Sequence, residues 1–132
     1  MATLTATLKL TAAAGQISTN SLSISESDTL TIDPIPMQGV TRVALAASGG
    51  SAVELVPSSA EVKFVYIKNT GLQSDGTTAT THVVEVSIGG NSVIRVHAGE
   101  FAFIPVVASS AVTAVGSSTH LILAEFAFFT RS

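Results

Sequence analysis

Short runs of Val, Ile, Thr and Phe, separated by clusters of Gly, Ser, Asn and Pro, follow one another along the whole chain, and helix-period patterns are hard to find. The clearest run is residues 3–10, where Leu and Ala alternate with Thr and Lys. A period of two places the apolar residues on one face of a strand, whereas a helix would scatter them around its axis. We therefore predict a half-buried strand at 3–10 and an all-β chain with no substantial helix.

The remaining runs predict further short strands, each bounded by turn residues. The candidate strands after 3–10 are 22–25, 29–33, 40–46, 52–56, 61–68, 82–88, 92–98, 101–107, 111–115 and 121–129. We expect a polar link at 26–28 and the longest exposed loop at 69–81. Because proline cannot donate a ladder hydrogen bond, Pro105 should lie in an edge strand or end its strand.

A hairpin is predicted at 82–98, where two β-rich runs flank a three-residue connection, Gly89-Gly90-Asn91. Pairing Glu85 with Arg95 also pairs Val84 with Val96 and Val86 with Ile94, so that one face is wholly apolar. A shift of one residue would mix the two faces, which burial of one face forbids. We expect the hydrophobic face to decide this register, because a surface ion pair contributes only about 0.2–1 kcal/mol.

The length of 132 residues predicts one β domain over 1–132, in which 1–10 is a candidate N-terminal arm or exchanged strand. About nine or ten short strands with frequent turns predict an antiparallel β-sandwich or a jelly-roll-like fold. Charged residues make up only 11% of the chain, while 17 Ser and 16 Thr supply a quarter of it. Such a charge-poor surface suggests that another molecule covers much of it.

Several classes of partner and chemistry are disfavoured by composition. Six Lys/Arg against nine Asp/Glu, without a basic cluster, predict no nucleic-acid binding. The absence of Cys excludes disulfides and thiolate sites. The N-terminus has no pattern of a secretory signal, so we expect none. The uncharged stretch between Glu100 and Glu125 is interrupted by Pro105 and Gly116, so we predict no membrane segment.

No catalytic, metal or cofactor site is predicted. His97 points to the polar face of the hairpin and His82 lies at the start of the opposite face, so we expect that these two do not converge. His120 lies at the start of another strand, and no Cys or spaced carboxylate supports a zinc site. A serine nucleophile needs a neighbouring base and an orienting group, and no Gly-x-Ser-x-Gly motif occurs. We therefore expect a protein that is not an enzyme and carries no cofactor.

The six Phe are predicted to fill the core, but Phe128 and Phe129 are neighbours on one strand and must point to opposite faces. The run 121–129 is apolar on both faces, so it needs cover on both sides. A second copy of the chain would supply that cover in a homo-oligomer; a central strand in a well-covered monomer is the alternative. The candidate subunit-interface residues are Leu4, Leu8, Phe126, Phe128 and Phe129.

Several segments together resemble a family of small virion structural proteins from tailed bacteriophages. They are MATLTATL at 1–8, SDTLT at 27–31, VYIKNTG at 65–71, AGEFAFIP at 98–105 and the aromatic ending at 126–130. The resemblance touches most of the chain, and its motifs are structural rather than catalytic. It implies a repeated subunit of a capsid decoration (cement) type that binds the major capsid protein or other virion proteins.

The resemblance further implies a trimer, located in the virion and assembled in the host cytoplasm. A tail, neck or fibre subunit of the same kind of virion is the first alternative. A carbohydrate-binding adhesin module is the second, and it would need an exposed aromatic platform, although Tyr66 is the single Tyr and Trp is absent.

Overall fold

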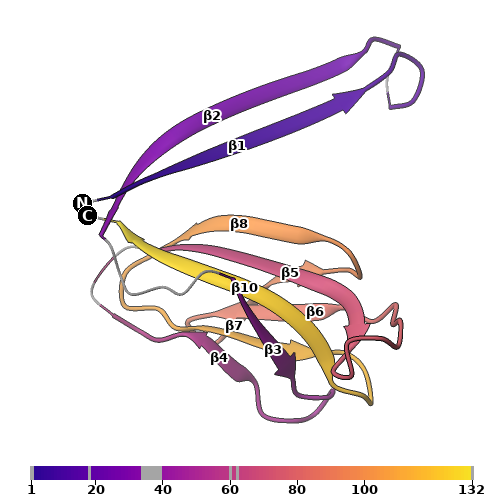
Figure 1. Ribbon diagram of the computed structural model, residues 1–132, viewed down its shortest axis with the longest axis vertical. Helices are drawn as coiled ribbons and strands as arrows, with labels where there is room; N and C mark the ends of the chain where they lie inside the picture. Colours follow the sequence, from indigo (N-terminus) through magenta and orange to yellow (C-terminus); the bar gives the residue numbers. More distant parts are fainter. Residues whose placement is uncertain (1, 18, 34–39, 60, 62, 132) are drawn as a thin grey trace. The chain divides into compact units, whose positions relative to one another are not determined.

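The computed structural model describes residues 2–17, 19–33, 40–59, 61 and 63–131, and strands dominate throughout (Figure 1). The strands are β1 (Ala2–Ala12), β2 (Leu22–Asp33), β3 (Thr41–Leu45), β4 (Val53–Val56), β5 (Lys63–Gln73), β6 (Val84–Ile88), β7 (Asn91–Val96), β8 (Phe101–Val106), β9 (Val112–Gly116) and β10 (Ile122–Arg131). Within the described ranges the chain forms no helix, and thus none that is long and apolar enough to cross a membrane. The predicted all-β class and its strand number are confirmed.

The described residues fall into two compact units, 2–33 and 40–131. The first unit, called the arm below, is a long antiparallel ribbon in which Ala2 pairs with Ile32 at one end and Ala12 with Leu22 at the other. The prediction of two short strands at 22–25 and 29–33 is wrong, because β2 is continuous. Its polar link 26–28 pairs with 6–8 of β1, which supplies backbone partners along the whole length. The single-domain organisation of 1–132 stays a prediction.

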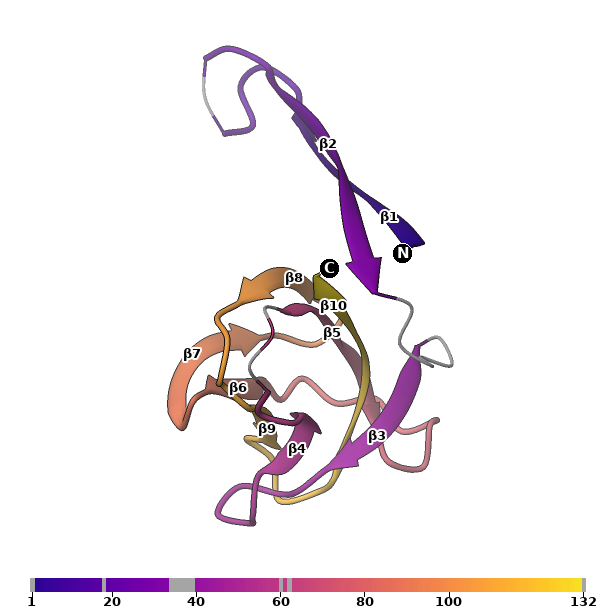
Figure 2. The same ribbon diagram turned by 90° about the vertical axis from the view of Figure 1, so that its left-hand side faces the viewer.

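The second unit is a sandwich of two antiparallel sheets. One sheet has the strand order β3-β10-β5-β8, and the other has the order β4-β9-β6-β7. Figure 2 shows β7, β6, β9 and β4 on the side of this unit opposite β10 and β3. The predicted edge position of Pro105 is confirmed, since β8 ends the first sheet and pairs with β5 alone.

Branched aliphatic side chains from both sheets fill the space between them. The fully buried members are Leu45, Val56, Val65, Ile67, Val84, Val86, Val112 and Ile122. They come from β3, β5 and β10 on one side and from β4, β6 and β9 on the other. Alternation along each strand delivers one inward residue in two, which accounts for the sandwich without any helix.

The hairpin β6–β7 has the predicted register: Glu85 faces Arg95, and Val84 and Val86 face Val96 and Ile94. Its turn is shorter than predicted, because Asn91 already pairs with Ile88. Gly89 and Gly90 alone make the turn, both with positive φ (58° and 86°), as a primed two-residue turn requires. The extra residue is absorbed as a bulge at Val93, between the pairs of Ser92 and Ile94.

The loop predicted at 69–81 is shorter in the structure, because β5 continues to Gln73. Asn69 pairs with Ala124 and Leu72 with Leu123, so Thr70 and Gly71 form a bulge against β10. Gly71 there has a φ of 74°, a conformation that other residues rarely adopt. The sequence Asn69-Thr70-Gly71 is typical of a turn, but here the chain bends and stays in the sheet.

Candidate functional site

The outer face of the sheet β3-β10-β5-β8 carries most of the aromatic side chains of the sandwich. Val65, Ile67, Ala102 and Ile104 belong to or pack on the core, so the residues between them on β5 and β8 point outward. Those outward residues are Phe64, Tyr66, Phe101, Phe103 and Pro105, and Phe129 of β10 joins them opposite Phe64. We call this surface the aromatic face; Figure 1 shows its strands β8, β5 and β10 side by side.

The aromatic side chains of this face contact one another in two pairs. The rings of Phe64 and Phe103 are stacked with centroids 6.1 Å apart, and those of Tyr66 and Phe101 lie 6.4 Å apart at 40°. Phe101 remains 66% exposed and Phe103 37% exposed. The prediction that Phe101 and Phe103 lie in the core is therefore wrong. Large apolar side chains exposed in a group are typical of a contact surface.

Charged residues are placed beside the aromatic rings. Glu125 lies directly opposite Lys68 on β5 and opposite Arg42 on β3, and the Arg42 guanidinium is 2.9 Å from the Glu125 carboxylate. Burial raises the pKa of the Tyr66 hydroxyl, and the negative charge of Glu125 raises it further. Tyr66 is thus a neutral, partly buried ring that can offer a hydrogen bond at the edge of an apolar surface.

The arm presents a second exposed apolar surface, which the register of the ribbon defines. Even-numbered residues of both strands share one face, called the arm face: Ala2, Leu4, Ala6, Leu8, Leu10, Ala12, Leu22, Ile24, Glu26, Asp28, Leu30 and Ile32. Leu8 is 50% exposed and Leu10 45% exposed. The predicted alternation of 3–10 is confirmed, but the predicted half-burial fails at these two leucines, where the exposed fractions remain high.

Among the predicted interface residues, the structure separates those that face the core from those that do not. Phe126 and Phe128 pack against the core between the sheets. Phe129 points to the aromatic face, as the alternation along the strand predicted. Leu4 and Leu8 lie on the arm face. Whether any of the five touches a second copy stays a prediction.

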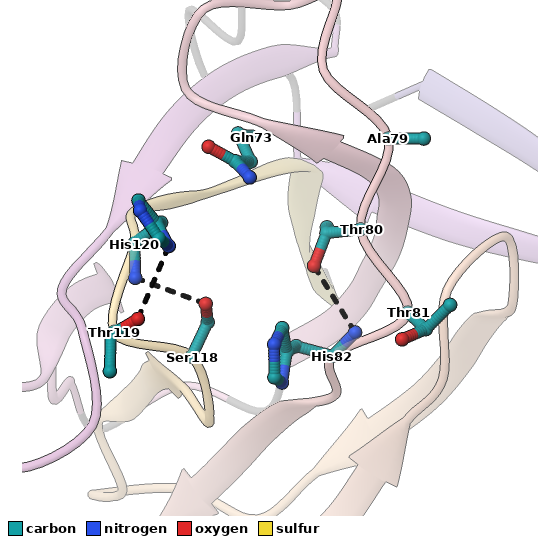
Figure 3. A pocket seen from close by; sticks show the side chains of 8 residues that line it. All are labelled: Gln73, Ala79, Thr80, Thr81, His82, Ser118, Thr119 and His120. Atoms are coloured by element: carbon teal, nitrogen blue, oxygen red, sulfur yellow. Dashed lines mark hydrogen bonds between the residues drawn. The ribbon is translucent and has the colours of Figure 1, made fainter.

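A polar pocket lies at one end of the sandwich (Figure 3). It has a volume of about 420 Å³ and is lined by Gln73, Ala79, Thr80, Thr81, His82, Ser118, Thr119 and His120. The turn after β5 and the segment before β10 bring His82 and His120 to one pocket, which the sequence did not predict. His97 does not line it.

The chemistry offered by this pocket is limited. The Ser118 hydroxyl accepts a hydrogen bond from the backbone N–H of His120 at 3.0 Å, and the His120 ring contacts the neighbouring Thr119 hydroxyl at 3.2 Å. In the described part of the chain, no group of three or more His, Asp or Glu is arranged to hold a metal ion. The pocket therefore offers hydroxyl, amide and imidazole groups that can hydrogen-bond a small polar molecule.

Sequence reasoning missed the aromatic face. The signal was the residue type at alternate positions: Lys68 shares a face with Tyr66, and Glu125 shares one with Phe129. A charged residue favours an outward face, and aromatic residues of the same parity then point outward too. On β5 the buried Lys63 shares a face with Val65 and gives the opposite indication, so Glu125 of β10 is the clearer signal. Comparisons of this chain with known protein families, with curated proteins and with solved structures find no match.

Proposed function

We propose that this chain is a non-enzymatic structural protein of a bacteriophage virion, namely a capsid decoration protein that binds the major capsid protein lattice and stabilises it. The observation that carries the proposal is the pair of exposed apolar surfaces, the arm face and the aromatic face. Exposed apolar surfaces of this kind are typical of protein–protein contact, and a chain with two of them suits a repeated subunit with more than one neighbour.

Composition and motifs support the same function. Only 11% of the residues are charged, so few charges are available to hydrate the surface of a free monomer. The resemblance of five segments to small virion proteins supplies the virion location, the assembly in the host cytoplasm and the trimeric state. A trimer engages several lattice subunits at once, so modest affinity at each contact is multiplied. Neither nucleic acid nor membrane is a partner in this proposal.

The test is to locate the chain on particles. An antibody raised against the purified protein is used for immunogold labelling of virions from the culture that produces it. Label over the heads, together with heads that break at a lower temperature when the protein is removed, supports a decoration protein. Label confined to the tail, neck or fibres overturns the decoration protein and supports a tail, neck or fibre subunit instead. Virions without any label overturn the virion assignment altogether.

A carbohydrate-binding adhesin module is a second candidate, and the aromatic face is the observation that favours it. Tyr66 and Phe101 form a tilted pair on an open surface, and the Tyr66 hydroxyl can hydrogen-bond a sugar. A glycan array with the purified protein tests it, and Phe101→Ala serves as the paired variant. Binding that is lost in Phe101→Ala supports this candidate, and an array without any bound glycan removes it.

A further inference from the structure

We propose that the arm face of one copy packs on the aromatic face of a second copy of this chain. This inference rests on the homo-oligomer of the proposed function but not on the virion location. It deepens that function by naming the two surfaces that meet. It is tested with the protein alone in dilute solution, so its failure and the failure of the virion assignment are distinguishable.

The arm needs cover from another molecule or element. A two-stranded ribbon is at best marginally stable in water unless its apolar face packs against something. Leu8 and Leu10 nevertheless remain about half exposed, and Ile24 is 37% exposed. The apolar residues continue along the ribbon from Leu4 and Leu30 to Leu10 and Ile24, which is a long stripe rather than a single side chain.

Two carboxylates on the arm face decide what can cover it. Asp28 lies opposite Ala6 and Glu26 lies opposite Leu8, in the middle of a ribbon that runs from Ala2 to Ala12. If two arms packed face to face, in either direction, their four carboxylates would meet near the centre of an apolar interface. Like charges brought together away from water are strongly unfavourable. The arm face therefore requires a partner that is apolar but carries positive charge.

The aromatic face has that combination. It exposes Phe101 and Phe103, and its charged residues are Arg42, Lys68, Arg131 and Glu125. Positive charges thus outnumber negative ones on this face, while the arm face carries two negative charges and no positive one. Such charge complementarity fixes the register of an interface and rejects wrong partners.

The two surfaces also match in length. β1 and β2 have 11 and 12 residues, and the central strands of the aromatic face, β5 and β10, have 11 and 10. At about 3.3 Å per residue, both surfaces extend for roughly 33–40 Å. A ribbon of this length can lie along the sheet over its whole extent and cover its apolar stripe.

Sedimentation velocity of the full chain at micromolar concentration measures the association, and two charge variants address its two sides. Leu8→Lys changes the arm face at an exposed position, where the new cation faces Glu26 within the ribbon. Phe101→Glu changes the aromatic face, also at an exposed position, beside Lys68. Thr5→Lys, on the opposite face of β1, is the matched control for the arm. Circular dichroism checks that each variant keeps its strands.

We expect each of the two variants alone to associate about tenfold more weakly or worse, and Thr5→Lys to behave as the unmodified chain. An equimolar mixture of the two variants is expected to form heterodimers. Leu8→Lys retains an intact aromatic face, and Phe101→Glu retains an intact arm face that can pack on it. The proposal is overturned by an unmodified chain that stays monomeric up to about 100 µM. It is equally overturned by a variant that associates as the unmodified chain does, or by a mixture that does not associate.

Discussion

Asn69 on β5 donates a hydrogen bond from its side-chain amide to the carbonyl oxygen of Val96, the last residue of β7, over 3.1 Å. The same amide donates to the carbonyl oxygen of His82 at 2.9 Å, and its own oxygen accepts from the backbone N–H of Gly71 at 3.0 Å. One fully buried side chain therefore connects the first sheet of the sandwich with the hairpin of the second.

Replacing Asn69 by Ala is expected to lower the free energy of unfolding by about 2–3 kcal/mol, because two carbonyl oxygens and one N–H lose their partner. Urea unfolding measures the change. Asn91→Ala, at an exposed asparagine of β7, is the control and should change the free energy by less than about 0.5 kcal/mol. Equal effects at both positions would show that Asn69 is not a structural link.

The pair Glu85–Arg95 should contribute little to stability although the carboxylate and guanidinium are 2.6 Å apart. The Arg95 side chain is largely exposed, so the expected coupling energy in a double-mutant cycle with Ala is about 0.2–1 kcal/mol, and high salt should reduce it. Val84→Ala on the buried face of the same strand should cost about 1.5–3 kcal/mol. A coupling energy larger than the loss of stability caused by Val84→Ala would contradict the expectation that the buried face contributes more than the ion pair.

Gly116→Ala is expected to destabilise the sandwich by about 1–3 kcal/mol, because a Cβ there would lie 2.9 Å from Cδ1 of Ile122 and 3.2 Å from the Ala46 carbonyl oxygen. Ile122→Val removes Cδ1, so the double variant should lose less stability than the sum of the two single changes. Thermal or urea unfolding of the four proteins gives the interaction energy. Strict additivity would contradict a contact between these two residues.

The carboxyl of Asp75 should titrate far below its ordinary value. The Thr78 hydroxyl and the backbone N–H groups of Thr77 and Thr78 hydrogen-bond its charged form and lower its pKa from 3.8 to about 2. Since the pKa of the folded state is depressed, the stabilising contribution is present above pH 3.8 and is lost as the pH falls through about 2. NMR titration of the side-chain carbonyl measures the midpoint. Thr78→Ala should move it upward, and a midpoint near 3.8 in the unmodified chain would contradict these hydrogen bonds.

The sequence predicted those features that follow from alternation within one strand. The pairing of Glu85 with Arg95 could be derived because burial of one face allows only one register of the hairpin. The two faces of β10 could be derived because side chains alternate along a strand. Features that depend on a neighbouring strand were not predictable in the same way. The polar link 26–28 stays in β2 because β1 pairs with it, and the bulge at Thr70–Gly71 exists because β10 passes beside it.

The candidate sites were harder to predict, for a related reason. Composition suggested a covered surface but could not say where it lies, and six Phe look alike until the neighbours of each are known. Phe126 and Phe101 have similar sequence surroundings, yet the first packs on the core and the second is exposed on an edge strand. His82 and His120 line one pocket because two segments distant in sequence lie at the same end of the sandwich.

Among the paired residues of the arm, the face opposite its leucines carries the odd-numbered residues, which are nine Thr or Ser and Lys9. Hydroxyl groups gain little on leaving water, so this side of the ribbon stays hydrated when the other side is occupied. A partner can therefore cover the arm on one side only. Arms do not stack on one another through both faces, as the sheets of a fibre do, because the hydroxyl-rich face offers no apolar contact.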